Sequence, residues 1–411
     1  MTDTLPLSDL RVIAVEQYGA GPFGTQLLGD LGADVIKIED PRSGGDVSRS
    51  VGPNFIDGAE DSVASLFYQA FNRNKRSATL DLARPAGVAV LHDLVKSADA
   101  VAGNLRGDVP AKLGLTYDHL GTVKPSIVCA HLTAYGRDGP RAAWPGYDYL
   151  MQAEAGYFAV TGEPGTAPAR MGLSIVDYMA GVTMGLALLA AVHEARRTGR
   201  GRDVDVSLFD TALSNLAYLS TWYLGAGHNE GRQPRSAHPS LTPCQLYKTA
   251  DGWVYLMCNK EKFWQALCQA INREGWADDE RFRTFKERRA NRDLLTEMLD
   301  AALSTRTTAA WMETFAGRVP AAPLCDVPMR WTIRSSLNGT ASSPGSRRAA
   351  RRSAPLLRRS ASETERRRLA RHRHWAQTPT RCCPISVTTR GASGSYATTG
   401  SSDRTGPRRR D

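Results

Sequence analysis

The chain has 411 residues, a length that predicts two or three domains rather than one. Hydrophobic residues make up 42% and charged residues 23%, which excludes an intrinsically disordered protein and an integral membrane protein. The net charge of +10 suggests nucleic-acid binding until its position is considered. Residues 330–411 hold 19 arginines and carry +15, so residues 1–329 carry −5. We therefore expect no nucleic-acid partner for the globular part.

The sequence also shows no sign of export or metal binding. Residues 1–9 lack a basic segment followed by an apolar one, so we expect no secretory signal. The most apolar stretch, residues 178–192, is about 15 residues long, and a transmembrane helix needs roughly 20, so we predict a buried helix and no membrane partner. The seven cysteines form no CxxC pair and no zinc-like spacing. We expect a cytoplasmic protein without a structural metal.

Strands and helices alternate in the first half of the chain. Apolar runs at 10–16 and 33–39 predict two strands, and 19–31 predicts a turn and helix between them. The same reasoning predicts strands at 98–102, 126–132 and 204–208, and helices at 85–96, 181–197 and 211–223. Such alternation is typical of a parallel sheet covered by helices on both faces. We predict an α/β protein whose residues 1–224 form a Rossmann-like large domain.

The second half has a different pattern. Residues 225–239 are rich in Gly, Pro, Arg and His, which indicates a domain boundary or an active-site loop. A hairpin is predicted over 245–258, followed by amphipathic helices over 260–271 and 291–303. We expect residues 225–328 to form a smaller α+β domain.

A glycine-rich segment follows the first predicted strand. Residues 19–24 read GAGPFG, and Glu39 follows about 20 residues after the first glycine, as in the dinucleotide-binding fingerprint. This pattern alone would favour an NAD-linked dehydrogenase. The alternative is that the glycines only allow close packing of helix against strand. Both interpretations remain open on this motif.

Many further motifs occur in a fixed order along residues 7–327. They are GAGPFGTQLLGDLGADVIKIED from Gly19, FNRNKRS from Phe71, KLGL from Lys112, GYD from Gly146, TGEP from Thr161 and TGRG from Thr198. Together these motifs resemble class III CoA transferases, the carnitine/bile-acid CoA-transferase family that includes formyl-CoA transferase. The resemblance implies an interlocked-ring homodimer, with two chains threaded through each other like links. It also implies CoA and acyl-CoA as substrates rather than a permanently bound cofactor, and a carboxylic acid as the acceptor.

By position, the resemblance places CoA in the large domain. Asp40 stands where some members have a basic residue near the adenine, so Arg42 is the expected substitute. Cations suit the phosphates of CoA, and backbone amides at a helix start add affinity for anions. The implied CoA-binding residues are Gly19, Ala20, Gly21, Pro22, Arg42, Lys75, Arg76, Asn104, Lys112 and Tyr135.

Asp177 lies in an apolar stretch at the start of the long predicted helix. Its position alone favours an N-cap, because Asp is among the best capping residues. The resemblance implies instead the nucleophile, which forms an aspartyl-acyl anhydride and then an aspartyl-CoA thioester. We expect the helix N-terminus to keep this carboxylate ionised.

The chain has Tyr147 where the related α-methylacyl-CoA racemases have histidine. Tyrosine titrates near pH 10 and is a poor base at neutral pH, which favours CoA transfer over racemisation. A third possibility is a non-catalytic binding protein with a basic tail.

Residues 329–411 are rich in Ser, Arg, Thr and Gly and show neither helix nor strand periodicity. They form either a natural disordered tail or the product of a shifted reading frame. We favour the shift, because the codons after Met329 read one nucleotide earlier can encode a peptide resembling the family's usual continuation. In the family this part returns to the large domain.

Overall fold

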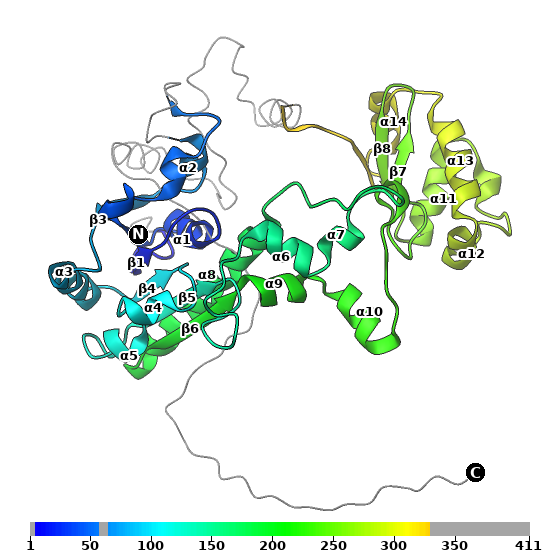
Figure 1. Ribbon diagram of the computed structural model, residues 1–411. Coiled ribbons are helices and arrows are strands. Elements are labelled where there is room, and N and C mark those ends of the chain that lie inside the picture. The colour runs from blue at the N-terminus through cyan, green and yellow to red at the C-terminus, as the bar shows by residue number, and fades with distance from the viewer. Residues whose placement is uncertain (1–4, 57–64, 329–411) are drawn as a thin grey trace, which may run out of the picture.

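The computed structural model describes residues 5–56 and 65–328, in two sheets that each carry helices (Figure 1). The expectation for residues 329–411 lies outside this part of the chain. The larger sheet is built from residues before position 208, and the smaller sheet from residues after position 243.

The larger sheet has six strands, all parallel, in the order β3-β2-β1-β4-β5-β6. This order is that of the doubly wound dinucleotide-binding fold, and it confirms the predicted α/β fold class. The strands are β1 (Arg11–Val15), β2 (Asp34–Glu39), β3 (Lys75–Thr79), β4 (Ala100–Gly103), β5 (Val128–Thr133) and β6 (Arg202–Ser207).

Helices cover both faces of this sheet because successive strand residues point to opposite sides. Val12 and Ala14 pack with α1 (Ala20–Asp30) and α8 (Ile175–Thr198) in one buried cluster. Ile13 packs on the other face with α3 (Pro85–Lys96). The remaining helices of this half are α2 (Leu66–Ala70), α4 (Val109–Lys112), α5 (Tyr117–Leu120), α6 (Asp148–Glu154), α7 (Tyr157–Val160), α9 (Leu208–Asn215) and α10 (Tyr218–Ala226).

Helix α8 is the long buried helix that the sequence predicts, but it begins six residues earlier, at Ile175. It ends at Gly199, whose φ of 73° is the left-handed conformation that glycine adopts readily at a helix C-terminus. By length and composition this helix could cross a bilayer, yet 56% of its apolar stretch is buried inside the protein. We therefore interpret α8 as a core helix.

The single helix predicted over 211–223 is in fact two helices. The helical conformation is interrupted between α9 and α10 at Ala217, which has a φ of 45°. No residue of α10 is fully buried, and Leu224 is 81% exposed. The apolar pattern therefore predicted helix correctly but gave no sign of the break.

The smaller sheet is antiparallel, in the order β7-β8-β9, and has its own hydrophobic core. It carries the predicted hairpin, and Trp264, Phe282 and Leu299 are buried beneath it. In Figure 1 this half stands to one side of the large sheet. Its elements are β7 (Cys244–Lys248), β8 (Trp253–Met257), α11 (Glu261–Ala270), α12 (Phe285–Ala290), α13 (Arg292–Leu303), α14 (Thr308–Phe315) and β9 (Ala321–Pro323).

Candidate active site

The strand order places the switch point of the sheet, which is the position of the ligand crevice in doubly wound folds, at the carboxyl ends of β1 and β4. The segments that leave these strands are joined by the side chain of Asn104. Its Nδ2 donates to the carbonyl of Gln17 (2.8 Å), and its Oδ1 accepts from the N–H of Gln17 (2.9 Å). Ligands of doubly wound folds bind at this switch point.

Asp177 reaches this crevice from α8. The N-cap of α8 is Ser174, and Asp177 is the third helical residue. Its Oδ2 lies 2.7 Å from the place that a Cβ atom on Gly19 would occupy. The glycine is therefore required for close approach, and the structure brings the predicted nucleophile against the predicted glycine-rich turn.

The capping role considered for Asp177 belongs to Asp148, the first residue of α6. The backbone N–H of Asp177 donates to Oδ2 of Asp148 (2.9 Å). Gln152, one turn further along α6, donates to Oδ1 of Asp148 (2.6 Å) and accepts from the N–H of Met171 (2.9 Å). Both side chains are buried. They fix the start of α8 and the loop before it.

Burial, and then the negative charge of Asp148, raise the pKa of Asp177 to about 8. The expectation that the helix N-terminus keeps this carboxyl group ionised is therefore wrong at neutral pH. Loss of hydration and the like charge of Asp148 both favour the protonated form. Together they outweigh the stabilisation of the carboxylate by the helix dipole, which is about 1 kcal/mol or less at exposed sites. A perturbed carboxyl group in a crevice is typical of catalytic sites.

Tyr18 lies close enough to Asp177 for the two to interact electrostatically, and its ring contacts that of Tyr147. The rings of Tyr18 and Tyr147 lie 6.4 Å apart, edge to face, and Tyr147 is 60% exposed. Burial, followed by the neighbouring Tyr147 and Asp177, raises the pKa of Tyr18. Tyr18 has a φ of 68°, which is strained for a side chain other than glycine, and its N–H donates to Asp46 (3.1 Å). A buried ion pair with Lys37 holds Asp46 in place.

The sequence analysis included Asp148 only within the GYD motif. It did not identify Gln152, Tyr18 or Asp46 as part of the site. The available signals were weak. Gln152 follows Asp148 by four residues, which places both on one helix face. Nothing local indicates that the turn after β1 meets Asp46.

Most of the predicted CoA-binding residues lie at the carboxyl edge of the sheet. Gly19, Ala20, Gly21 and Pro22 form the buried first turn of α1 and its N-cap. Asn104 follows β4 directly. Three further predicted residues are exposed or partly exposed: Arg42 after β2 pairs with Asp40 (2.7 Å), Tyr135 after β5 donates to Glu154 (2.9 Å), and Lys112 on α4 pairs with Asp108 (2.5 Å).

Lys75 and Arg76 lie elsewhere, at the start of β3. The ammonium group of Lys75 is buried against Glu16 (2.8 Å) and Thr25, beneath the first turn of α1. Arg76 pairs with Asp34 (2.7 Å) at the amino end of β2, the opposite edge of the sheet. In this arrangement Lys75 supports the turn from below, and Arg76 lies away from the crevice.

Glu39 is the residue that would bind a ribose in the NAD interpretation, but its carboxylate is already engaged. It is 3% exposed, and Arg49 (2.6 Å), Ser77 (2.5 Å) and the N–H of Asp46 (2.8 Å) donate to it. Burial alone would raise the pKa of Glu39, but these donors and Lys37 lower it to about 2. This geometry disfavours a dinucleotide site.

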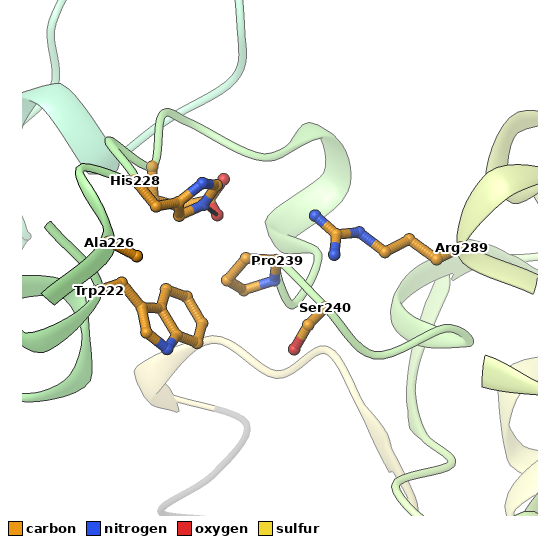
Figure 2. A pocket seen from close by; sticks show the side chains of 7 residues that line it. Trp222, Ala226, His228, Pro239, Ser240 and Arg289 are labelled. Atoms are coloured by element: carbon orange, nitrogen blue, oxygen red, sulfur yellow. Dashed lines mark hydrogen bonds and ion pairs between the residues drawn. The ribbon is translucent and has the colours of Figure 1, made fainter. Parts of the chain in front are cut away.

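A separate cavity of about 240 Å³ lies between α10 and α12. Figure 2 shows Trp222 and His228 on one side, with Arg289 extending toward Pro239 from the other. Asp177 does not line it. The predicted loop at 225–239 forms part of this cavity, and Arg232 also reaches the carbonyl of Thr166 (2.6 Å) in the loop before α8.

Comparison with known proteins agrees with this geometry. Residues 7–334 match the family model for CoA-transferase family III. The succinate–glutarate CoA-transferase of Agrobacterium fabrum is 38% identical, over 70% of this chain and 72% of that protein. The acetyl-CoA:oxalate CoA-transferase of Acetobacter aceti is 35% identical, over 78% of this chain and 81% of that protein.

Among solved structures, a CaiB/BaiF family protein from Brucella suis matches with a TM-score of 0.70 and 33% identity, over 80% of this chain and 86% of that one. The sequence relatives are CoA-transferases that act on CoA thioesters, and they resolve the choice between CoA and NAD that the glycine motif left open. The chain is an enzyme that belongs to CoA-transferase family III.

Proposed function

We propose that the protein transfers CoA from an acyl-CoA donor to a carboxylic acid through covalent intermediates on Asp177. The observation that carries this proposal is the position of the Asp177 carboxyl group, held against Gly19 at the switch point of the sheet. A carboxylate in that place can attack a thioester presented above the turn after β1.

The reaction begins with the ionised form of Asp177. Its oxygen forms a bond to the acyl carbon, and the carbon–sulfur bond breaks to release CoA thiolate and leave an aspartyl-acyl anhydride. The thiolate then attacks the aspartyl carbonyl carbon, which releases the donor acid and leaves an aspartyl-CoA thioester. The acceptor carboxylate repeats the two steps in reverse and leaves with CoA. Every step exchanges one carboxylate or thiolate for another.

In this proposal CoA lies along the carboxyl edge of the sheet and is a substrate, and no resident cofactor takes part. The N-terminus of α1 and Arg42 offer donors for its phosphates. Asn104 holds the turn beneath them. Tyr147 in place of histidine supports transfer rather than racemisation.

We further propose an interlocked homodimer that works in the cytoplasm. Met179, Val182 and Leu186 are exposed at successive turns along one side of α8, and Leu224 of α10 is largely exposed. A partner chain would remove this apolar surface from water. The described cysteines are free thiols, which fits a reducing compartment.

A comparison of two matched variants tests the catalytic proposal. Asp177→Asn removes the nucleophile with little change of shape, and we expect CoA transfer to fall by roughly 1,000-fold or more. Asp93→Asn makes the same change at an exposed ion pair on α3 and should leave the rate unchanged. Transfer that persists in Asp177→Asn at the rate of Asp93→Asn would refute the proposal.

A further inference from the structure

Arg170 lies on the loop that leads into α8, seven residues before Asp177. Its guanidinium carbon stands 4.2 Å above the centre of the Tyr149 ring. Nη1 donates to the carbonyls of Met171 (3.0 Å) and Gly172 (3.1 Å). The side chain is exposed, but the ring and the two carbonyls fix its orientation.

This loop is itself fixed to the catalytic helix. Gln152 accepts from the N–H of Met171 and donates to the carbonyl of Leu173 (3.1 Å) and to Asp148, which caps α8. Arg170 is also close enough to Asp148 to act on it electrostatically. The loop that carries Arg170 is therefore attached to the start of α8 by the hydrogen bonds of the buried Gln152 side chain.

Among the residues that the structure describes, no carboxylate forms a direct ion pair with Arg170, although Asp148 lies within electrostatic reach, and Nε and Nη2 of Arg170 make no hydrogen bond there. Other arginines around this crevice do have partners. Arg42 pairs with Asp40, Arg141 with Glu154, and Arg49 with Glu39. An oriented guanidinium with two donors to spare is suited to bidentate binding of a carboxylate.

Arg170 and Asp177 share a neighbourhood of tyrosine side chains. Tyr149 carries the guanidinium and is 45% exposed, and Tyr149 and Asp177 both act on the hydroxyl of Tyr18. A nucleophile, exposed aromatic rings and an oriented cation therefore occur in one neighbourhood. A molecule with two carboxylates joined by a short carbon chain matches all three.

We propose that Arg170 binds the second carboxylate of a dicarboxylic acid while the first carboxylate reacts at Asp177. This inference rests on the proposed function, and it names the substrate class. The names of the two sequence relatives include succinate, glutarate and oxalate, which are all dicarboxylic acids. In this role Arg170 determines specificity and takes no part in bond making.

The test compares glutarate with valerate, which has the same number of carbons and a single carboxylate. Binding of each acid to the full chain is measured by calorimetry, for the wild type, Arg170→Met and Arg170→Lys. We expect Arg170→Met to weaken glutarate binding by roughly 10- to 100-fold and to leave valerate binding unchanged. Arg170→Lys should recover part of the loss, because it restores the charge but not the planar fork.

Arg306→Met is the matched control. Arg306 also stacks on a ring (Trp311, 4.7 Å) and donates to a carbonyl (Ala310, 3.2 Å), but it lies in the small domain. It should not affect the binding of either acid. Equal weakening of glutarate and valerate by Arg170→Met, or wild-type protein that binds glutarate no better than valerate, would overturn the inference.

The same measurement in the Asp177→Asn background separates this inference from the proposed function, since binding there needs no turnover. Selective glutarate binding that depends on Arg170 in that background supports the role of Arg170 whatever the rate of transfer. Transfer that survives Asp177→Asn contradicts the proposed nucleophile and leaves the result for Arg170 standing.

Discussion

Asp148 caps the helix that carries Asp177, and in doing so it sets a buried negative charge beside the nucleophile. The N–H of Asp177 donates to Oδ2 of Asp148 at 2.9 Å. The same contact that fixes the position of Asp177 helps to raise its pKa to about 8, after the larger effect of burial. Position and protonation of the nucleophile are therefore coupled.

The pH dependence of CoA transfer follows from this coupling. Asp177 attacks only when it is ionised, so kcat/KM should rise with pH and level off above about pH 8. Asp148→Asn removes the neighbouring charge, and the midpoint of the rise should move to lower pH. In that variant the midpoint should still lie above the usual pKa of aspartate, near 4, because Asp177 remains buried. A rise whose midpoint is the same in both proteins would contradict the coupling.

The stability of the protein should also depend on pH through the raised pKa of Asp177. A folded-state pKa raised above the unfolded value means that the folded protein holds this proton more tightly. The contribution of Asp177 to stability is therefore full below about pH 4 and declines as the pH rises toward 8. Asp177→Asn should be more stable than the wild type at pH 8 by about 2–5 kcal/mol, and the difference should shrink toward pH 4. Denaturant unfolding at the two pH values measures this, and a difference that does not change with pH would count against it.

Gly19 should tolerate no side chain, because a Cβ atom would lie 2.7 Å from Oδ2 of Asp177. Gly19→Ala displaces the carboxyl group, and we expect the transfer rate to fall by roughly 100-fold while the protein stays folded. Gly275→Ala is the control, since a Cβ atom there meets no atom within 4 Å. Steady-state kinetics measures the transfer rate of both variants, and circular dichroism checks that both are folded. Normal activity in Gly19→Ala would show that Asp177 is not held where we place it.

Glu39 should be structural rather than ligand-binding. Glu39→Gln leaves Arg49 without its carboxylate partner, while Lys37 keeps Asp46, and we expect a loss of about 3 kcal/mol in the free energy of unfolding. Since its folded pKa of about 2 lies below the unfolded value, its stabilising effect is present above about pH 4 and is lost on further acidification. Urea unfolding at pH 7 and at pH 3 tests both statements. NAD binding that disappears in this variant would argue for the dinucleotide interpretation instead.

The sequence predicted the large sheet well where strands are apolar on both faces. The bounds of α3 and of the first two strands agree with the structure to within one residue. Strand β3 was not predicted, because its residues KRSAT are polar and it lies at the sheet edge. Strand β9 has three residues and pairs with β8 across more than sixty positions, which no local pattern indicates.

The site was predictable in its parts but not in its contacts. Asp177 and the glycine turn were found from motifs, yet the distance between them depends on how α8 packs on α1. The buried pair of Lys75 and Glu16 joins residues 59 positions apart, so a lysine that looks available for a phosphate is in fact part of the core. The contact by which Asp148, rather than Asp177, caps α8 joins residues 29 positions apart and is likewise not visible in the sequence.

The most direct test of the central claim is mass spectrometry of the protein after incubation with an acyl-CoA and hydroxylamine. Hydroxylamine converts an aspartyl anhydride or thioester into a stable hydroxamate. We predict a hydroxamate on the peptide that holds Asp177, and none in the Asp177→Asn variant. An unmodified Asp177 peptide in protein that is turning over acyl-CoA would contradict the account.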